Sequence, residues 1–201
     1  MSTKRNIQVI VLNGGSSSGK SSIARELQEI LPGIWLTFGV DTFIDALPGG
    51  GTSPRAGITF QHDGTITFSA EHRALERIWY SGLSRMAETG AHMILDEALL
   101  SGGAGQRRLQ SSFSNVELMW AGVHCDAGVA AARESHRADR VKGMAIRQAL
   151  SVHDGVTYDV EVDTTHRSPA ECARGRAGGR PFSPDAPAAV VVLTAHGPDS
   201  P

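Results

Sequence analysis

Short apolar runs alternate along the chain with segments in which apolar residues recur every three or four positions. The runs are rich in β-branched residues and end at glycine or polar residues, as strands buried on both faces do. Strands are predicted at residues 7–12, 35–40, 92–95, 116–123 and 158–162. Helical spacing predicts helices at residues 21–31, 42–47, 75–86, 105–113 and 127–150, the last interrupted by an arginine-rich stretch.

Residues 58–68 follow a different pattern, because apolar and polar residues alternate there on either side of Asp63-Gly64. That pattern predicts a β-hairpin. Strands that alternate with helices favour right-handed crossovers and a parallel sheet that binds ligands at the carboxyl ends of its strands. Between the first strand and the first helix, residues 14–21 read Gly-Gly-Ser-Ser-Ser-Gly-Lys-Ser, the pattern of a phosphate-binding loop. The sequence therefore predicts an α/β, three-layer fold of the P-loop NTPase type. It has a central five-stranded, mostly parallel sheet, helices on both faces, a hairpin excursion and an Arg-rich lid.

The chain length favours a single domain, since 201 residues with 40% hydrophobic residues can bury one substantial core. We place this domain at residues 1–172. From Arg174 onward the composition changes to glycine, proline, arginine and small residues. Residues 173–201 are therefore predicted to be a disordered tail. Residues 188–195 contain Val-Val-Val-Leu, and an added edge strand is the alternative there.

Charge and composition limit the partners. The formal net charge of −2 comes from interspersed acids and bases, so neither nucleic acid nor a membrane surface is expected as a partner. No apolar run is long enough for a signal sequence or a membrane span, which favours a cytoplasmic protein. Cys125 and Cys172 share no metal or redox spacing and are expected to be reduced thiols. A small-molecule partner fits best, and a homo-oligomer is left open.

The strongest motif follows the first predicted strand. Residues 14–21 read Gly-Gly-Ser-Ser-Ser-Gly-Lys-Ser, a phosphate-binding loop with a strand before it and a helix after it. Backbone N–H groups in such a loop converge on phosphate oxygens at a helix N-terminus. Lys20 is expected to bridge the β and γ phosphates of ATP, and Ser21 to ligate Mg²⁺. The predicted nucleotide-binding residues are Gly14, Gly15, Ser16, Ser17, Ser18, Gly19, Lys20, Ser21 and Ser22.

Acidic residues follow two further strands. Asp41 ends the second strand, where it would face the γ-phosphate and accept the proton of an attacking hydroxyl. Alternatively, Asp41 caps a helix that starts at Thr42. Asp96-Glu97 follows the third strand, and Asp96 is predicted to hold Mg²⁺ together with Ser21. A solvated strand end is the alternative for this pair.

Four arginines cluster in the predicted lid: Arg133, Arg137, Arg140 and Arg147. A mobile lid would bring guanidinium groups to the transferring phosphoryl group and exclude water. Arg137 and Arg140, three residues apart, are the predicted catalytic pair. The alternative is a helix face with ion pairs to Glu134 and Asp139.

Several strings resemble the chloramphenicol phosphotransferases. They are LNGGSSSGKS at residues 12–21, WLTFGVD at 35–41, RALE at 73–76, VHDGV at 152–156 and YDVEVDTTH at 158–166. The resemblance runs from about residue 6 to Cys172. It implies that the acceptor is the primary hydroxyl of chloramphenicol, that Asp41 is the general base and that Arg137 and Arg140 are the lid arginines. The biological role implied is antibiotic resistance or self-protection of a producer.

The chain departs from that family at two places. Family members carry paired aspartates where this chain has Asp96-Glu97, which is expected to alter activity by shifting groups in the site. Beyond Cys172 the family continues into a terminal helix, whereas this chain continues into its Gly/Pro/Arg-rich tail.

Three other readings stay open. Shikimate-, gluconate- or nucleoside-type kinases would share the first strand and loop, but Arg55 is the only arginine between Asp41 and Arg73 to bind an acceptor carboxylate. An uncharged amphiphilic acceptor fits that stretch better. A toxin-like kinase acting on a nucleotide sugar is the second reading. The third is a nucleotide-binding switch, although the guanine-reading Asn-Lys-x-Asp motif is absent.

Overall fold

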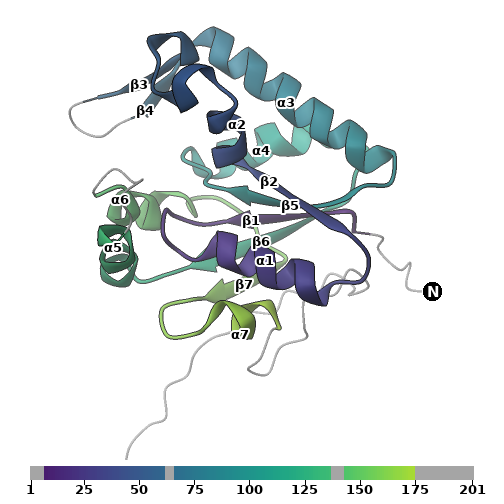
Figure 1. Ribbon diagram of the computed structural model, residues 1–201, viewed down its shortest axis with the longest axis vertical. Helices are drawn as coiled ribbons and strands as arrows, with labels where there is room; N and C mark the ends of the chain where they lie inside the picture. Colours follow the sequence, from purple (N-terminus) through teal and green to yellow (C-terminus); the bar gives the residue numbers. More distant parts are fainter. Residues whose placement is uncertain (1–6, 62–65, 137–142, 175–201) are drawn as a thin grey trace, which may run out of the picture.

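The computed structural model describes residues 7–61, 66–136 and 143–174. Its main sheet has five strands in the order β2-β5-β1-β6-β7, and each neighbouring pair is parallel. The strands are β1 (Val9–Asn13), β2 (Trp35–Gly39), β5 (His92–Glu97), β6 (Leu118–His124) and β7 (Val160–Asp163). Figure 1 shows helices on both faces of this sheet. The predicted three-layer α/β fold with a five-stranded sheet is confirmed.

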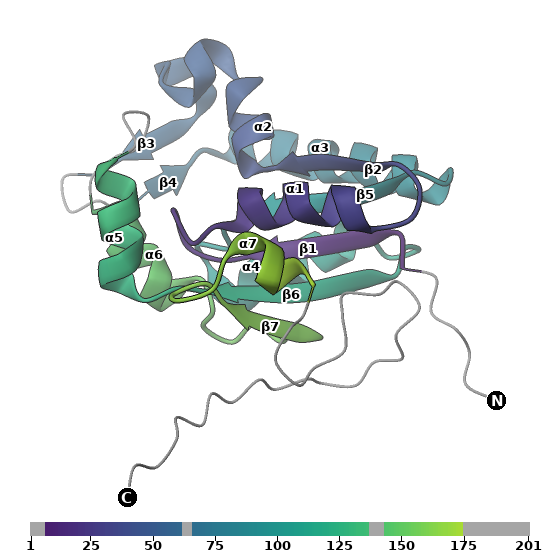
Figure 2. The same cartoon turned by 60° about the horizontal axis from the view of Figure 1, so that its bottom comes forward.

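The larger helices of the described chain are α1 (Lys20–Ile30), α3 (Ala70–Glu88), α4 (Gly102–Ser112), α5 (Ala127–Ser135) and α6 (Met144–Ser151). Two shorter ones are α2 (Val40–Asp45) and α7 (Pro169–Ala173). The helices α1 and α7 cover one face of the sheet, and α3 and α4 cover the other (Figures 1 and 2). Described residues include no helix that is long and apolar enough to cross a membrane.

Strand β1 is buried at every position because it lies in the centre of the sheet and packs on both faces. Ile10 and Leu12 belong to the core beneath α1, whereas Val9 and Val11 belong to the core beneath α3 and α4. This alternation follows from the two-residue repeat of a strand and explains the continuous apolar run. Every apolar side chain of β1 therefore contributes to one of the two cores, and Asn13 ends the strand as a buried polar residue.

The interrupted helix predicted at residues 127–150 is present as two separate helices, α5 and α6. Glu134 near the end of α5 is buried and accepts hydrogen bonds from Gly143 N at 2.7 Å and Ala145 N at 2.8 Å. These N–H groups belong to the start of α6. The first N–H groups of a helix have no hydrogen-bond partner within the helix. A buried carboxylate thus joins the two helices. The predicted catalytic arginines Arg137 and Arg140 lie outside the described residues.

The predicted hairpin is present as the antiparallel pair β3 (Ile58–Phe60) and β4 (Ile66–Phe68), although its Asp63-Gly64 turn lies outside the described residues. Two 3₁₀ turns, Pro48–Gly51 and Pro54–Ala56, precede it. Figure 2 shows the hairpin, α5 and α6 at one end of the molecule, beside the end of β1 that leads into α1. The elements outside the regular α/β repeat thus gather at the carboxyl end of the sheet.

The chain after β7 forms α7, a short helix that the sequence patterns did not predict. Ser168 and Glu171 form a capping box at its start, and Cys172 is buried against the core beneath α1. Cys125 and Cys172 are both free thiols, as expected. The predicted disordered tail at residues 173–201 and the alternative strand at 188–195 lie outside the described residues, except for Ala173 and Arg174.

Candidate active site

The loop between β1 and α1 is shaped by close backbone contacts. A Cβ atom on Gly14 would lie 2.4 Å from the carbonyl oxygen of Val123, so only glycine fits there. Gly19, directly before α1, has a φ of 93°, and Ser17 has a φ of 59°. Positive φ is uncommon for residues other than glycine and is found at strained functional loops. The loop therefore has the compact form that a phosphate-binding loop needs.

Three serine side chains of this loop are buried without a partner. Within the described residues, the Oγ atoms of Ser16, Ser17 and Ser18 form no hydrogen bond. A buried polar group without a partner costs about 1–3 kcal/mol, so three of them in one loop require an explanation. Phosphate oxygens would accept hydrogen bonds from such hydroxyls. The donor set of the loop thus fits the phosphates of a nucleotide.

Lys20, Ser21 and Asp96 meet where β1 and β5 end. The buried Lys20 donates from Nζ to the carbonyl oxygen of Gly15 at 2.9 Å and lies 3.6 Å from Asp96 Oδ1. Ser21 Oγ donates to Asp96 Oδ2 at 2.6 Å. Carboxylate and hydroxyl oxygens are the ligands that Mg²⁺ prefers in proteins. The oxygen atoms of Ser21 and Asp96 therefore fit a magnesium site next to the phosphate-binding loop.

Asp41 lies in the first turn of α2, directly after β2. The alternative in which Asp41 caps a helix starting at Thr42 is wrong, because α2 begins at Val40 and Gly39 occupies the N-cap position. Gly39 pairs with Asp96 across β2 and β5, and a Cβ atom on Gly39 would lie 2.2 Å from Asp96 O. The tight contact between these strand ends places the start of α2 beside Asp96.

Most of the predicted site residues that the structure describes line one cavity of about 440 Å³, which we call the main cleft, whereas Gly14, Gly15 and Ser18 do not line it. Lys20, Ser21, Asp96 and Asp41 all line it, together with Ser16, Ser17, Gly19 and Ser22 of the loop. Its opposite wall is apolar and comes largely from the hairpin, through Ile58, Phe60, Ile66 and Phe68. The structure therefore brings the phosphate-binding loop, two aspartates and an apolar wall into one space.

The base of the predicted lid reaches the main cleft through Arg133 and Gln148. Arg133 Nη2 donates to the carbonyl oxygen of Thr164 at 2.8 Å, so its guanidinium is fixed against the loop after β7. Gln148 Oε1 accepts from Ser16 N at 2.7 Å. Arg147, also predicted for the lid, is exposed on α6. Of the described lid arginines, only Arg133 lines the cleft.

Thr164 is a support of the loop that the sequence patterns did not single out. Its hydroxyl donates to Ser18 O at 2.7 Å and accepts from Arg133 Nη1 at 3.3 Å. Thr164 belongs to the YDVEVDTTH string, so the family resemblance included this residue. The resemblance did not indicate that Thr164 contacts Ser18. The carboxyl end of β7 thus fixes the backbone of the phosphate-binding loop.

A buried network supports the loop from the other face of the sheet. Asn13 Nδ2 donates to Tyr158 Oη at 2.6 Å and to Val152 O at 2.8 Å. Because the tyrosine hydroxyl accepts from Asn13, its own hydrogen is directed to His153 Nδ1, 2.6 Å away. Burial, followed by the nearby His124 and Lys20, lowers the pKa of His153 to about 4. A neutral His153 can accept this hydrogen bond at neutral pH, which keeps the network intact.

Glu97 follows Asp96 on β5 but points to the opposite face, toward α3. Tyr80 donates to Glu97 Oε2 at 3.0 Å, whereas Glu97 Oε1 is buried and has no hydrogen-bond partner among the described residues. Burial raises the pKa of Glu97 to about 8, and the neighbouring Asp96 adds to the shift. Glu97 therefore carries a proton at neutral pH and lies on the opposite face of the sheet from the contact between Asp96 and Ser21.

We expect Glu97→Gln to stabilise the protein in a pH-dependent manner. The unfolded chain ionises Glu97 near 4.5 and the folded chain near 8, so the wild type loses stability as the pH rises through this window. Glutamine does not ionise, and the variant avoids this loss. Its melting temperature should exceed that of the wild type by at least about 3 °C at pH 8, with the difference shrinking toward pH 4.5.

Thermal unfolding measured from pH 4.5 to 8.5 tests this expectation. Glu29→Gln on the exposed face of α1 is the matched control, since that side chain is not buried. A difference between Glu97→Gln and the wild type that is constant over the whole pH range would contradict the burial of an uncharged Glu97.

Comparisons with known proteins identify the family of the chain. A family model described as "Chloramphenicol phosphotransferase-like protein" matches residues 7–177. A Mycobacterium tuberculosis protein of strain H37Rv, named "Putative O-phosphotransferase Rv2636", is 28% identical over 184 residues, covering 83% of this chain and 79% of that protein.

Solved kinase structures share the fold. A sugar kinase from Janibacter sp. HTCC2649 is similar with a TM-score of 0.60 at 19% identity, covering 83% of this chain and 90% of that one. A gluconokinase from Sinorhizobium meliloti 1021 is similar with a TM-score of 0.54 at 18% identity, covering 85% and 89%. Because the family model matches most of the chain, the protein belongs to the chloramphenicol phosphotransferase-like family and is a phosphotransferase with a P-loop kinase fold.

Proposed function

We propose that the protein is an ATP-dependent O-phosphotransferase that phosphorylates a hydroxyl of a small antibiotic, the primary hydroxyl of chloramphenicol. The observation that carries this proposal is that Lys20, Ser21 and Asp96 line the same cleft as Asp41. A phosphate-binding end and a carboxylate that can meet an alcohol are the two parts that such a transfer requires. The biological consequence is resistance to the antibiotic or self-protection of a producer.

The loop residues supply the nucleotide end of this site. The serine hydroxyls of residues 16–18 and the backbone N–H groups of Gly15, Ser17 and Gly19 would hold the phosphates, and Ser21 and Asp96 would hold Mg²⁺. The bound ion supplies positive charge to the phosphate oxygens. Lys20 is already directed into the loop by its bond to Gly15, so its ammonium adds positive charge at the same place.

In the proposed reaction, Asp41 accepts the proton of the acceptor hydroxyl. The hydroxyl oxygen forms a bond to the γ-phosphorus, while the bond from that phosphorus to the β–γ bridging oxygen breaks and ADP leaves. Charge develops on the transferred group, and Lys20 offsets it. Arg137 and Arg140 stay predictions for the same role, because they lie outside the described residues.

The apolar wall of the main cleft favours an aromatic, uncharged acceptor. Ile58, Phe60, Ile66 and Phe68 of the hairpin face the cleft, and Phe60 is 55% exposed. An aromatic ring that packs on these side chains buries apolar surface on both sides, which stabilises binding by about 25 cal/mol per Å². Chloramphenicol combines such a ring with a primary hydroxyl, so both ends of the cleft would be used.

An ATP consumption assay over chloramphenicol, shikimate, gluconate and nucleosides tests the proposal. We expect chloramphenicol-dependent release of ADP and a product heavier by one phosphoryl group, identified by mass spectrometry. Phosphorus NMR of the product should show that the phosphate is attached to the primary hydroxyl. ATP consumption that depends on another acceptor in the panel, but not on chloramphenicol, would overturn the assignment of the antibiotic and keep the transferase.

A further inference from the structure

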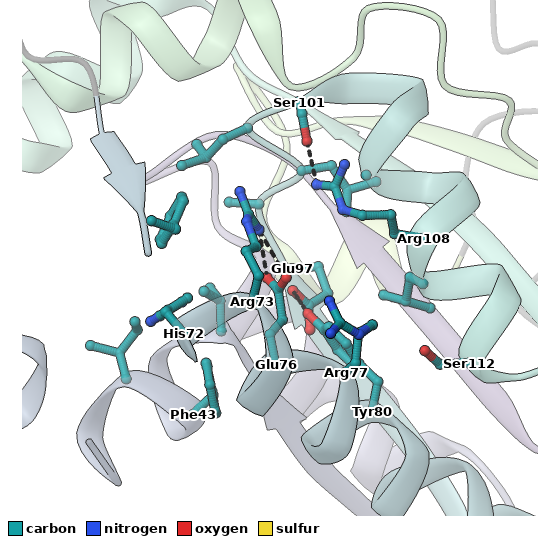
Figure 3. Close-up of a pocket in the computed structure, with 18 of the residues that line it drawn as sticks. Phe43, His72, Arg73, Glu76, Arg77, Tyr80, Glu97, Ser101, Arg108 and Ser112 are labelled. Atoms are coloured by element: carbon teal, nitrogen blue, oxygen red, sulfur yellow. Dashed lines mark hydrogen bonds and ion pairs between the residues drawn. The ribbon is translucent and has the colours of Figure 1, made fainter. Parts of the chain in front are cut away.

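A second cavity adjoins the main cleft and contains groups that the proposed transfer does not use. It has a volume of about 130 Å³, close to that of a cavity that accepts a benzene ring. We call it the arginine pocket, because Arg73, Arg77 and Arg108 line it together with Glu76, Tyr80 and Glu97. Figure 3 shows these side chains converging from α3, α4 and the end of β5.

The two cavities share a wall. Val40, Ile44, Phe68, Ala98 and Leu100 line both of them. Val40 directly precedes Asp41, so a molecule whose hydroxyl meets Asp41 can extend past this wall into the arginine pocket. The pocket is therefore placed to receive the part of an acceptor that does not react.

The guanidinium groups of the pocket are held in different ways. Arg73 Nη1 donates to both carboxylate oxygens of Glu76, at 3.0 Å to Oε1 and 2.8 Å to Oε2, and Arg73 Cζ lies 4.2 Å from the centre of the Phe68 ring. Arg108 Nη2 donates to Ser101 Oγ at 2.6 Å. Arg77 is exposed and has no ion pair with a described residue. Three arginines and two glutamates, Glu76 and Glu97, thus line the pocket.

Glu97 lies at the buried end of the pocket. Its Oε2 accepts from Tyr80, and its Oε1 is buried and has no hydrogen-bond partner among the described residues. The guanidinium groups of Arg73, Arg77 and Arg108 are therefore the main donors that the pocket offers to a ligand.

We propose that the arginine pocket binds the non-reacting end of the acceptor and selects for a planar group with two terminal oxygen atoms, a nitro or a carboxylate group. Planar guanidinium groups match such oxygen pairs with parallel N–H bonds. This inference rests on the proposed function, because it places the reacting hydroxyl at Asp41. The sequence argument found only Arg55 between Asp41 and Arg73 to bind an acceptor carboxylate. In the folded chain, α3 and α4 supply further arginines for such a group.

Calorimetric binding of three probes tests the inference separately from turnover. The probes are chloramphenicol, its analogue with hydrogen in place of the nitro group, and its analogue with a carboxylate there. The variant is the double change Arg77→Met and Arg108→Met. Arg107→Met is the matched control, since Arg107 is an exposed neighbour on α4 that does not line the pocket.

We expect the double variant to bind the nitro or the carboxylate probe at least about tenfold more weakly, as the loss of a charge-assisted hydrogen bond implies. The affinity for the hydrogen analogue should change less than about twofold in the double variant. Arg107→Met should bind all probes like the wild type. The probe that binds more weakly to the double variant than to the wild type identifies the group that the pocket prefers, nitro or carboxylate.

Two results would overturn the inference: equal affinity of the wild type for all three probes, or an equal loss for all three in the double variant. Failure of the proposed function has a different signature, because the wild type would then bind probes selectively without consuming ATP. The binding and turnover measurements on the same protein therefore separate the two.

Discussion

Replacing Lys20 with methionine is expected to lower kcat for acceptor phosphorylation by at least about 10³-fold, because the loss of a cation that faces a transferring phosphoryl group has effects of this order. Methionine keeps most of the length of the side chain and removes the charge. The Lys20 ammonium is buried and fixed between Gly15 O and Asp96 Oδ1, so water cannot simply take its place. Steady-state ADP release measures the effect.

Arg25→Met is the matched control, because Arg25 is an exposed cation on the same helix. It should keep kcat within about twofold of the wild type. If Lys20→Met turned over acceptor at the wild-type rate while remaining folded, the phosphate-binding role of the loop would be excluded.

Asp41→Asn is expected to lower acceptor-dependent turnover by at least about 10²-fold, the contribution of a positioned general base. Asparagine has the same shape and still accepts hydrogen bonds, but it does not accept the proton of an alcohol. Nucleotide affinity should stay close to that of the wild type, because Asp41 comes from α2 and not from the phosphate-binding loop. Turnover and ATP binding measured on one preparation therefore separate chemistry from binding.

Asp45→Asn, at the exposed end of the same short helix, controls for a loss of helix stability. Full activity of Asp41→Asn would remove Asp41 from the mechanism. Equal losses in both variants would assign the effect to α2 as a whole.

The sequence predicted the parts of this protein that depend on short-range pattern. The apolar runs identified the five strands, because a buried strand requires consecutive apolar residues. The motif at residues 14–21 identified the loop, because its turn requires glycines at fixed positions. Element ends were less well predicted. The last strand begins at Val160, two residues later than expected, because Tyr158 turns its hydroxyl to Asn13 before the ladder starts.

Contacts between distant segments could not be predicted. Thr164, which follows β7, contacts Ser18 in the loop after β1. Glu134 of α5 contacts the first residues of α6. Neither contact leaves a periodic signal, since each depends on where two elements pack. The arginines of the second cavity were missed for the same reason, because α3 and α4 converge only in the folded chain.

The position of Asp96 and Glu97 at the end of β5 has a consequence for insertions and deletions. Successive side chains of a strand point to opposite faces, so Asp96 reaches Ser21 on one face of the sheet and Glu97 reaches Tyr80 on the other. A slip of β5 by one residue against β1 would exchange them, bringing the longer side chain of Glu97 to Ser21 and turning Asp96 toward Tyr80. The registry of β5 against β1 thus determines which of the two acids meets the phosphate-binding loop.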